Sequence, residues 1–106
     1  MSSSDIKMRL EALVAGPPTK KCKQVIAVME KIVMAYPDRL KLDIYHAGMQ
    51  LTISPTDGFQ NEGKLKKIPS AFVNGVLVVS GEMLEEDELR ETVESELARG
   101  ERYWEK

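Results

Sequence analysis

The chain's single cysteine, Cys22, is the residue with the clearest capacity for chemistry. Lys20 and Lys21 precede it directly, and Thr19 stands three residues before it. Nearby cations and the N-terminus of a helix both lower the pKa of a thiol and so favour the nucleophilic thiolate. A threonine hydroxyl at this spacing could donate a hydrogen bond to that thiolate. Cys22 and Thr19 are therefore candidate catalytic residues for chemistry at one sulfur.

A buried, structural Cys22 is the competing interpretation. Cys22, Val25, Ile26 and Met29 recur at spacings of three and four, which places them on one face of a helix. Cysteine is also among the residue types that are most often buried. With one cysteine, the chain cannot form an intrachain disulfide or a cysteine-rich metal centre by itself. His46 is the only histidine, so we expect no metal site and no cofactor.

A second informative segment is Ile68-Pro69, which precedes two short apolar runs joined by Asn74-Gly75. Asn-Gly between such runs predicts a β-hairpin over residues 70–80, because both positions of its tight turn need a positive φ. A proline at the first residue of a strand removes no ladder hydrogen bond. Lys67 adds a positive charge directly before this segment.

The elements that would position these residues follow from the hydrophobic periodicity. Alternation predicts strands over residues 8–14 and 40–44, and a spacing of three and four predicts a helix from a Thr19 N-cap to about Tyr36. A last helix is expected after the hairpin, over residues 84–99. The strand–helix–strand order favours a parallel pair, to which the hairpin adds antiparallel strands. We expect the helices before and after the hairpin to cover the two faces of the sheet.

Residues 46–66 are less clearly patterned. Leu51-Thr52-Ile53 could form a short strand, and residues 57–66 could hold a short helix. The pattern leaves open whether residues 46–66 form a helix, a hairpin or an ordered loop.

Length and composition bound the class of protein. With 106 residues, 42% of them hydrophobic and 30% charged, the chain suits one globular domain over residues 1–106. We expect flexible tails at residues 1–6 and 101–106, where Trp104 could dock on the body or fray. No apolar run approaches the roughly 20 residues of a membrane span, and the N-terminus lacks the apolar core of a signal peptide. A cytoplasmic location without membrane association is therefore expected.

The charge is unevenly distributed along the chain. Residues 1–81 carry 11 basic and 7 acidic side chains (+4), whereas residues 82–106 carry 4 basic and 10 acidic ones (−6), which gives the net charge of −2. The basic excess is small and has no aromatic residues interleaved with it, so we expect no binding to nucleic acid. The acidic C-terminal segment is best interpreted as a solvated helix.

The order of elements, the segment from Ala15 to Cys22 at the helix start, and Ile68-Pro69 before the hairpin together resemble a thioredoxin-like domain over about residues 7–97. The resemblance implies an α/β, thioredoxin-like fold: a mixed sheet of about four strands flanked by two to three helices, with a cis Ile68–Pro69 bond. The family's Cys-x-x-Cys motif falls on Thr19-Lys20-Lys21-Cys22, where Thr19 stands in place of the first cysteine. A hydroxyl cannot replace the attacking thiolate, so dithiol chemistry is expected to be lost.

The same resemblance suggests what the chain does. In the family, the groove beside the proline holds a substrate strand through backbone hydrogen bonds, so Ile68 and Pro69 are candidate binding residues here. Lys20, Lys21 and Lys67 would favour an acidic protein or peptide as the partner. We expect a binding or adaptor module without disulfide reductase activity. The alternatives are a monothiol redox protein or sensor that uses Cys22, and a structural subunit without a site of its own.

Overall fold

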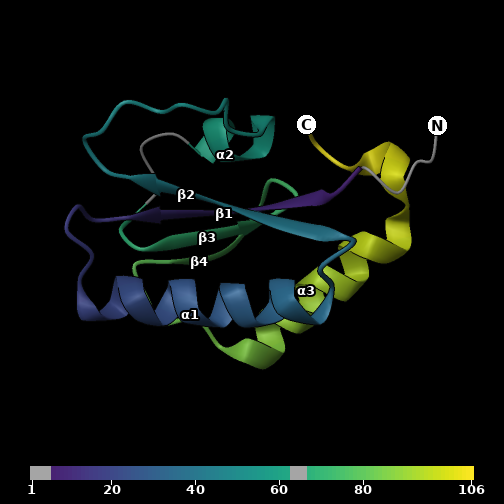
Figure 1. The fold of residues 1–106 in the computed structure, drawn as a ribbon, viewed down its shortest axis with the longest axis horizontal. Helices are drawn as coiled ribbons and strands as arrows, with labels where there is room; N and C mark the ends of the chain where they lie inside the picture. The colour runs from purple at the N-terminus through teal and green to yellow at the C-terminus, as the bar shows by residue number, and fades with distance from the viewer. Residues whose placement is uncertain (1–5, 63–66) are drawn as a thin grey trace.

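The computed structural model describes residues 6–62 and 67–106. Its core is one mixed four-stranded sheet, in the order β2-β1-β3-β4 (Figure 1). β1 pairs in parallel with β2, whereas β3 is antiparallel to both β1 and β4. The strands are β1 (Met8–Val14), β2 (Leu40–His46), β3 (Ser70–Val73) and β4 (Val76–Ser80). The expected α/β architecture with a mixed sheet of four strands is confirmed.

Three α-helices accompany the sheet: α1 (Lys20–Ala35), α2 (Asp57–Glu62) and α3 (Glu86–Arg99). α1 and α3 lie together on one face, and α2 lies over the other (Figure 1). The helices thus cover both faces of the sheet, as expected, but the two long helices share one face. The reason is that both long helices bury their apolar stripes in the same core, against the face of β1 that carries Met8, Leu10, Ala12 and Val14.

The start of α1 is fixed by the predicted N-cap. The Thr19 side chain accepts a hydrogen bond from the Cys22 backbone N–H at 3.2 Å, which satisfies one of the orphan amides of the first turn. The helix ends at Tyr36, immediately before Pro37. Cys22, Val25 and Met29 form part of its fully buried stripe, as the spacing of apolar residues predicts.

The predicted hairpin is also confirmed. Asn74 and Gly75 have φ values of 49° and 78°, the conformation that the tight turn requires. The Asn74 side-chain amide donates to Glu96 Oε1 at 2.9 Å and to the Tyr103 carbonyl at 3.1 Å. The turn therefore ties the sheet to α3 and to the segment that follows it.

The two less patterned regions have different outcomes. α2 lies within the expected helical stretch 57–66, of which residues 63–66 are outside the described residues. Residues 51–53 form no strand; they belong to an irregular loop with exposed Leu51 and Ile53 side chains. The end of this loop is bound to β1, because the Ser54 carbonyl accepts a hydrogen bond from the Arg9 side chain at 2.9 Å.

The C-terminal segment packs against the body, which is one of the two alternatives expected for Trp104. A short 3-10 helix, η3 (Glu101–Tyr103), leads to Trp104, which is only 7% exposed and packs in the core. The Glu105 backbone N–H donates to Asn74 Oδ1 at 2.6 Å, and its carboxylate accepts from the Gly58 N–H at 2.9 Å. At the other end, residues 1–5 of the expected N-terminal tail lie outside the described residues. None of the described helices combines the length and the hydropathy needed to span a membrane.

Candidate functional site

The start of α1 and the segment before β3 lie at the same end of the sheet. The antiparallel register pairs Leu13, near the end of β1, with Ser70, the first residue of β3. The next residue after β1, Ala15, donates a backbone hydrogen bond to Cys22 Sγ at 3.4 Å. Figure 1 shows the end of β1, the start of α1 and the start of β3 together at the left of the view. The residues predicted from two distant parts of the sequence therefore belong to one region.

The Cys22 sulfur is enclosed at this junction. Its side chain has no exposed surface, and Sγ accepts hydrogen bonds from the Thr19 hydroxyl at 3.1 Å and from the Ala15 N–H at 3.4 Å. Burial raises the pKa of the Cys22 thiol, but the hydrogen bonds from Ala15 and Thr19 lower it, and together they leave it below its usual value. The site therefore favours a thiolate electrostatically while shielding it from solvent.

Thr19 cannot act as a second thiol beside Cys22. Its side chain is bound twice to Cys22, as acceptor from the backbone N–H and as donor to the sulfur. It is exposed, but an alcohol neither forms a disulfide nor attacks one as a thiolate does. The two hydrogen bonds cap the helix and orient the Cys22 side chain. A structural role is therefore enough to account for Thr19.

The segment before β3 is tied to the end of β4. The Ile68–Pro69 peptide bond is cis, and the Pro69 carbonyl accepts a hydrogen bond from the Gly81 N–H at 2.6 Å. The Lys67 N–H donates to Ser80 Oγ at 2.9 Å. Pro69 is buried, whereas Ile68 is 43% exposed. An apolar side chain is thus presented to solvent beside a buried proline.

Positive charge gathers at this end of the sheet. Lys20 and Lys21 open α1, Lys67 precedes Ile68, and all three are exposed. Within residues 6–62 and 67–106, none of the three forms an ion pair. Lys64 and Lys66, which precede Lys67 in the sequence, lie outside the described residues.

Two features were not predicted. The first is the position of His46, which the parallel register places beside Val14 at the same end of the sheet as Cys22. Its Cβ lies 3.7 Å from where a Cβ on Gly16 would be, so it packs against the loop before α1. Only knowledge of the strand register could have placed it there.

The second feature is a buried polar cluster on the α2 face of the sheet. Arg9 donates from Nε to Asp43 at 3.0 Å and from a terminal nitrogen to the Tyr45 hydroxyl at 2.8 Å. That hydroxyl donates to the fully buried Glu11 at 2.7 Å, and Glu11 also accepts from the Thr56 N–H at 2.9 Å and from the Thr56 hydroxyl. Burial and the neighbouring Glu11 raise the pKa of the Tyr45 hydroxyl well above its usual value. The cluster fastens the start of α2 to the sheet.

The polar cluster was missed because alternating polar residues in a strand ordinarily predict a solvated face. Here α2 and its preceding loop cover that face, and each buried charge has charged or hydrogen-bonding partners. In the part of the chain that the structure describes, no three His, Cys, Asp or Glu side chains converge as a metal site requires.

Comparison with known proteins gives no assignment: neither the models of protein families nor the curated proteins yield a match to this chain.

Proposed function

We propose that this chain is a binding module of thioredoxin-like fold that recognises an extended, acidic segment of a partner protein and has no disulfide reductase activity. The observation that carries the proposal is the junction of Ala15, Cys22 and the start of β3, around which Lys20, Lys21, Lys67 and Ile68 are exposed. The strand order and the resemblance of the two sequence segments support the fold assignment.

The chemistry of the junction supports binding over redox catalysis. The one sulfur has no exposed surface, and its neighbour at the position of a second thiol is a hydroxyl. By contrast, the exposed groups are an isoleucine and three lysines that form no ion pair with any described residue, and these suit recognition of carboxylates and an apolar side chain. A partner strand with alternating acidic and apolar residues would match both.

The proposal can be tested with a defined peptide. The probe is a seven-residue peptide of alternating glutamate and valine, and a peptide of alternating lysine and valine is the control. In 15N–1H correlation spectra, we expect the acidic peptide alone to shift the amides of Thr19, Lys20, Lys21, Lys67 and Ile68. Shifts confined to other parts of the chain, or equal shifts with the basic peptide, would overturn the proposal.

A monothiol redox function is the second candidate, and one observation favours it. The hydrogen bonds from Ala15 and Thr19 lower the pKa of Cys22, which raises the fraction of thiolate. Labelling the folded protein with a disulfide reagent over a range of pH separates the two functions. The binding proposal predicts labelling far slower than in the unfolded chain; fast labelling with a midpoint below about 8.5 would favour the monothiol function.

A further inference from the structure

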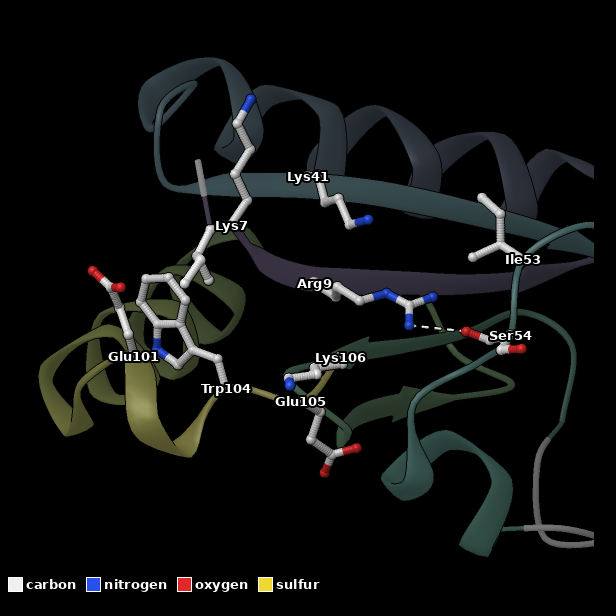
Figure 2. A pocket seen from close by; sticks show the side chains of 10 residues that line it. Lys7, Arg9, Lys41, Ile53, Ser54, Glu101, Trp104, Glu105 and Lys106 are labelled. Carbon is white, nitrogen blue, oxygen red and sulfur yellow. Dashed lines mark hydrogen bonds between the residues drawn. The ribbon is translucent and has the colours of Figure 1, made fainter. Parts of the chain in front are cut away.

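A second hollow lies at the opposite end of the sheet, where β1 and β2 begin and the chain ends. It has a volume of about 720 Å³ and lies between the strands, the loop that contains Ser54, and the C-terminal segment (Figure 2). The parallel register pairs Met8 with Leu40 at this end, whereas Val14 and His46 lie at the end near Cys22. The hollow is therefore separate from the junction discussed above.

The charge in this terminal groove is predominantly positive. Lys7, Arg9, Lys41 and Lys106 line it. Arg9 is already held by Asp43 and Ser54, but the three lysines have no ion pair among the described residues. Figure 2 shows Lys41 and Lys106 on either side of the Arg9 side chain.

The two glutamate side chains that line the groove point away from Arg9. The Glu105 carboxylate accepts a hydrogen bond from the Gly58 N–H at 2.9 Å, and Figure 2 shows it turned away from Arg9. The Glu101 carboxylate lies on the other side of the Trp104 ring from Arg9 in the same view. Among the described residues, neither glutamate carboxylate forms an ion pair with a lysine of the groove, so the ammonium groups remain available to an anion.

The rest of the lining is apolar. Trp104 forms one wall, and the half-exposed Ile6 and Ile53 side chains add apolar surface. Arg39 lies over the Trp104 ring at 5.3 Å from its centroid, which holds the indole in place. A pocket with apolar walls and a few convergent charges is typical of sites for small molecules.

We propose that this groove binds a small amphiphilic anion, in which one carboxylate or phosphate group is attached to an apolar body. The anionic group would bind Lys41 and Lys106, and the apolar body would pack against Trp104 and Ile53. The positive charge selects the sign of the ligand, and the indole and isoleucine side chains select against small inorganic anions, because these bury no apolar surface. The site is independent of the binding function proposed for the opposite end.

Trp104 is the only tryptophan of the chain, so all tryptophan fluorescence comes from the indole that forms a wall of this groove. The test titrates the full chain with octanoate, octyl phosphate, neutral octanol and inorganic phosphate. We expect saturable changes in emission with one or both of the amphiphilic anions, and binding that is weaker by about tenfold for octanol and for inorganic phosphate. Comparing octanoate with octyl phosphate shows which anionic group the groove prefers.

Substitution assigns the effect to the groove. Lys41→Gln and Lys106→Gln should each weaken binding of the preferred anion by about threefold to tenfold. Lys23→Gln, which removes an exposed lysine from α1, should leave it unchanged. All three positions are exposed, so the variants should fold. The proposal is overturned if octanol binds as well as the anions, or if the Lys41 and Lys106 variants bind like the wild type. It is also overturned if no probe changes either the Trp104 emission or the 15N–1H amide spectrum, which is recorded for the same titrations.

Discussion

The Thr19 hydroxyl donates a hydrogen bond to the Cys22 sulfur across 3.1 Å, at the first turn of α1. The same hydroxyl accepts the Cys22 backbone N–H. One threonine thus caps the helix and stabilises the sulfur that the helix carries. This arrangement accounts for a cysteine whose pKa is lowered although its side chain is fully buried.

Thr19→Cys should place a second thiol beside Cys22. A sulfur placed at the Thr19 Oγ1 position would need to move only ~1 Å to reach the disulfide bond length to Cys22. We therefore expect the wild-type chain to show no catalysis of insulin reduction by dithiothreitol, and Thr19→Cys to show measurable turnover. Thr19→Ser is the matched control and should stay inactive. A folded but inactive Thr19→Cys protein would contradict the alignment of Thr19 and Cys22 with the two cysteines of the Cys-x-x-Cys motif.

Stability should depend on pH through Cys22. Its pKa is lower in the folded chain than in the unfolded chain, so the folded state binds the thiol proton less tightly. The free energy of unfolding of the wild type relative to Cys22→Ala should therefore rise as pH increases through the folded pKa, and level off above the unfolded pKa. Urea denaturation between pH 6 and about pH 10 measures this difference. If this difference became smaller with increasing pH, the effect of burial on the pKa of Cys22 would have to outweigh that of the hydrogen bonds.

Glu11 should matter for stability because its carboxylate holds the polar cluster together. It accepts hydrogen bonds from the Tyr45 hydroxyl and from Thr56, and it is fully buried. Glu11→Gln keeps the size of the side chain but turns one acceptor into a donor that faces other donors. We expect a loss of about 1–3 kcal/mol in urea unfolding. Glu91→Gln, at an exposed position of α3, should change stability by less than about 0.5 kcal/mol; equal losses in the two variants would contradict this role.

Trp104 should stabilise the chain without a hydrogen bond from its indole N–H. Its indole Nε1 is buried without a hydrogen-bond partner in the described part of the chain. Trp104→Phe therefore loses no hydrogen bond and should cost clearly less than Trp104→Ala, for which about 3–5 kcal/mol is typical. Thermal or urea unfolding of both variants checks this order. If Trp104→Phe lowered the free energy of unfolding as much as Trp104→Ala does, the indole N–H would have to form a stabilising hydrogen bond.

Periodicity predicted the elements well because most of them are governed by local rules. The Thr19 N-cap, the apolar stripe that includes Cys22 and Val25, and the Asn74-Gly75 turn each depend on residues close in sequence. These elements were predicted at nearly their observed bounds. The junction of Cys22 with the start of β3 required the strand order as well, which the resemblance implied.

The remaining features depend on packing between distant segments. Nothing local to Arg9 and Glu11 reveals that α2 buries them, and nothing local to Trp104 reveals that Glu105 is anchored to Gly58 and Asn74. The shared face of α1 and α3 likewise depends on tertiary packing, because both helices bury apolar side chains against the same face of β1. Such features are decided by tertiary contacts, which periodicity does not report.

The most direct test of the account is the affinity of the acidic glutamate–valine peptide for the wild type, Cys22→Ala and Lys67→Gln, measured by calorimetry. The account predicts that Cys22→Ala, checked for its fold by its amide spectrum, binds as the wild type does. Lys67→Gln should bind about threefold to tenfold more weakly. Loss of binding in Cys22→Ala together with unchanged binding in Lys67→Gln would contradict a site built on surface charge and would point to the sulfur instead.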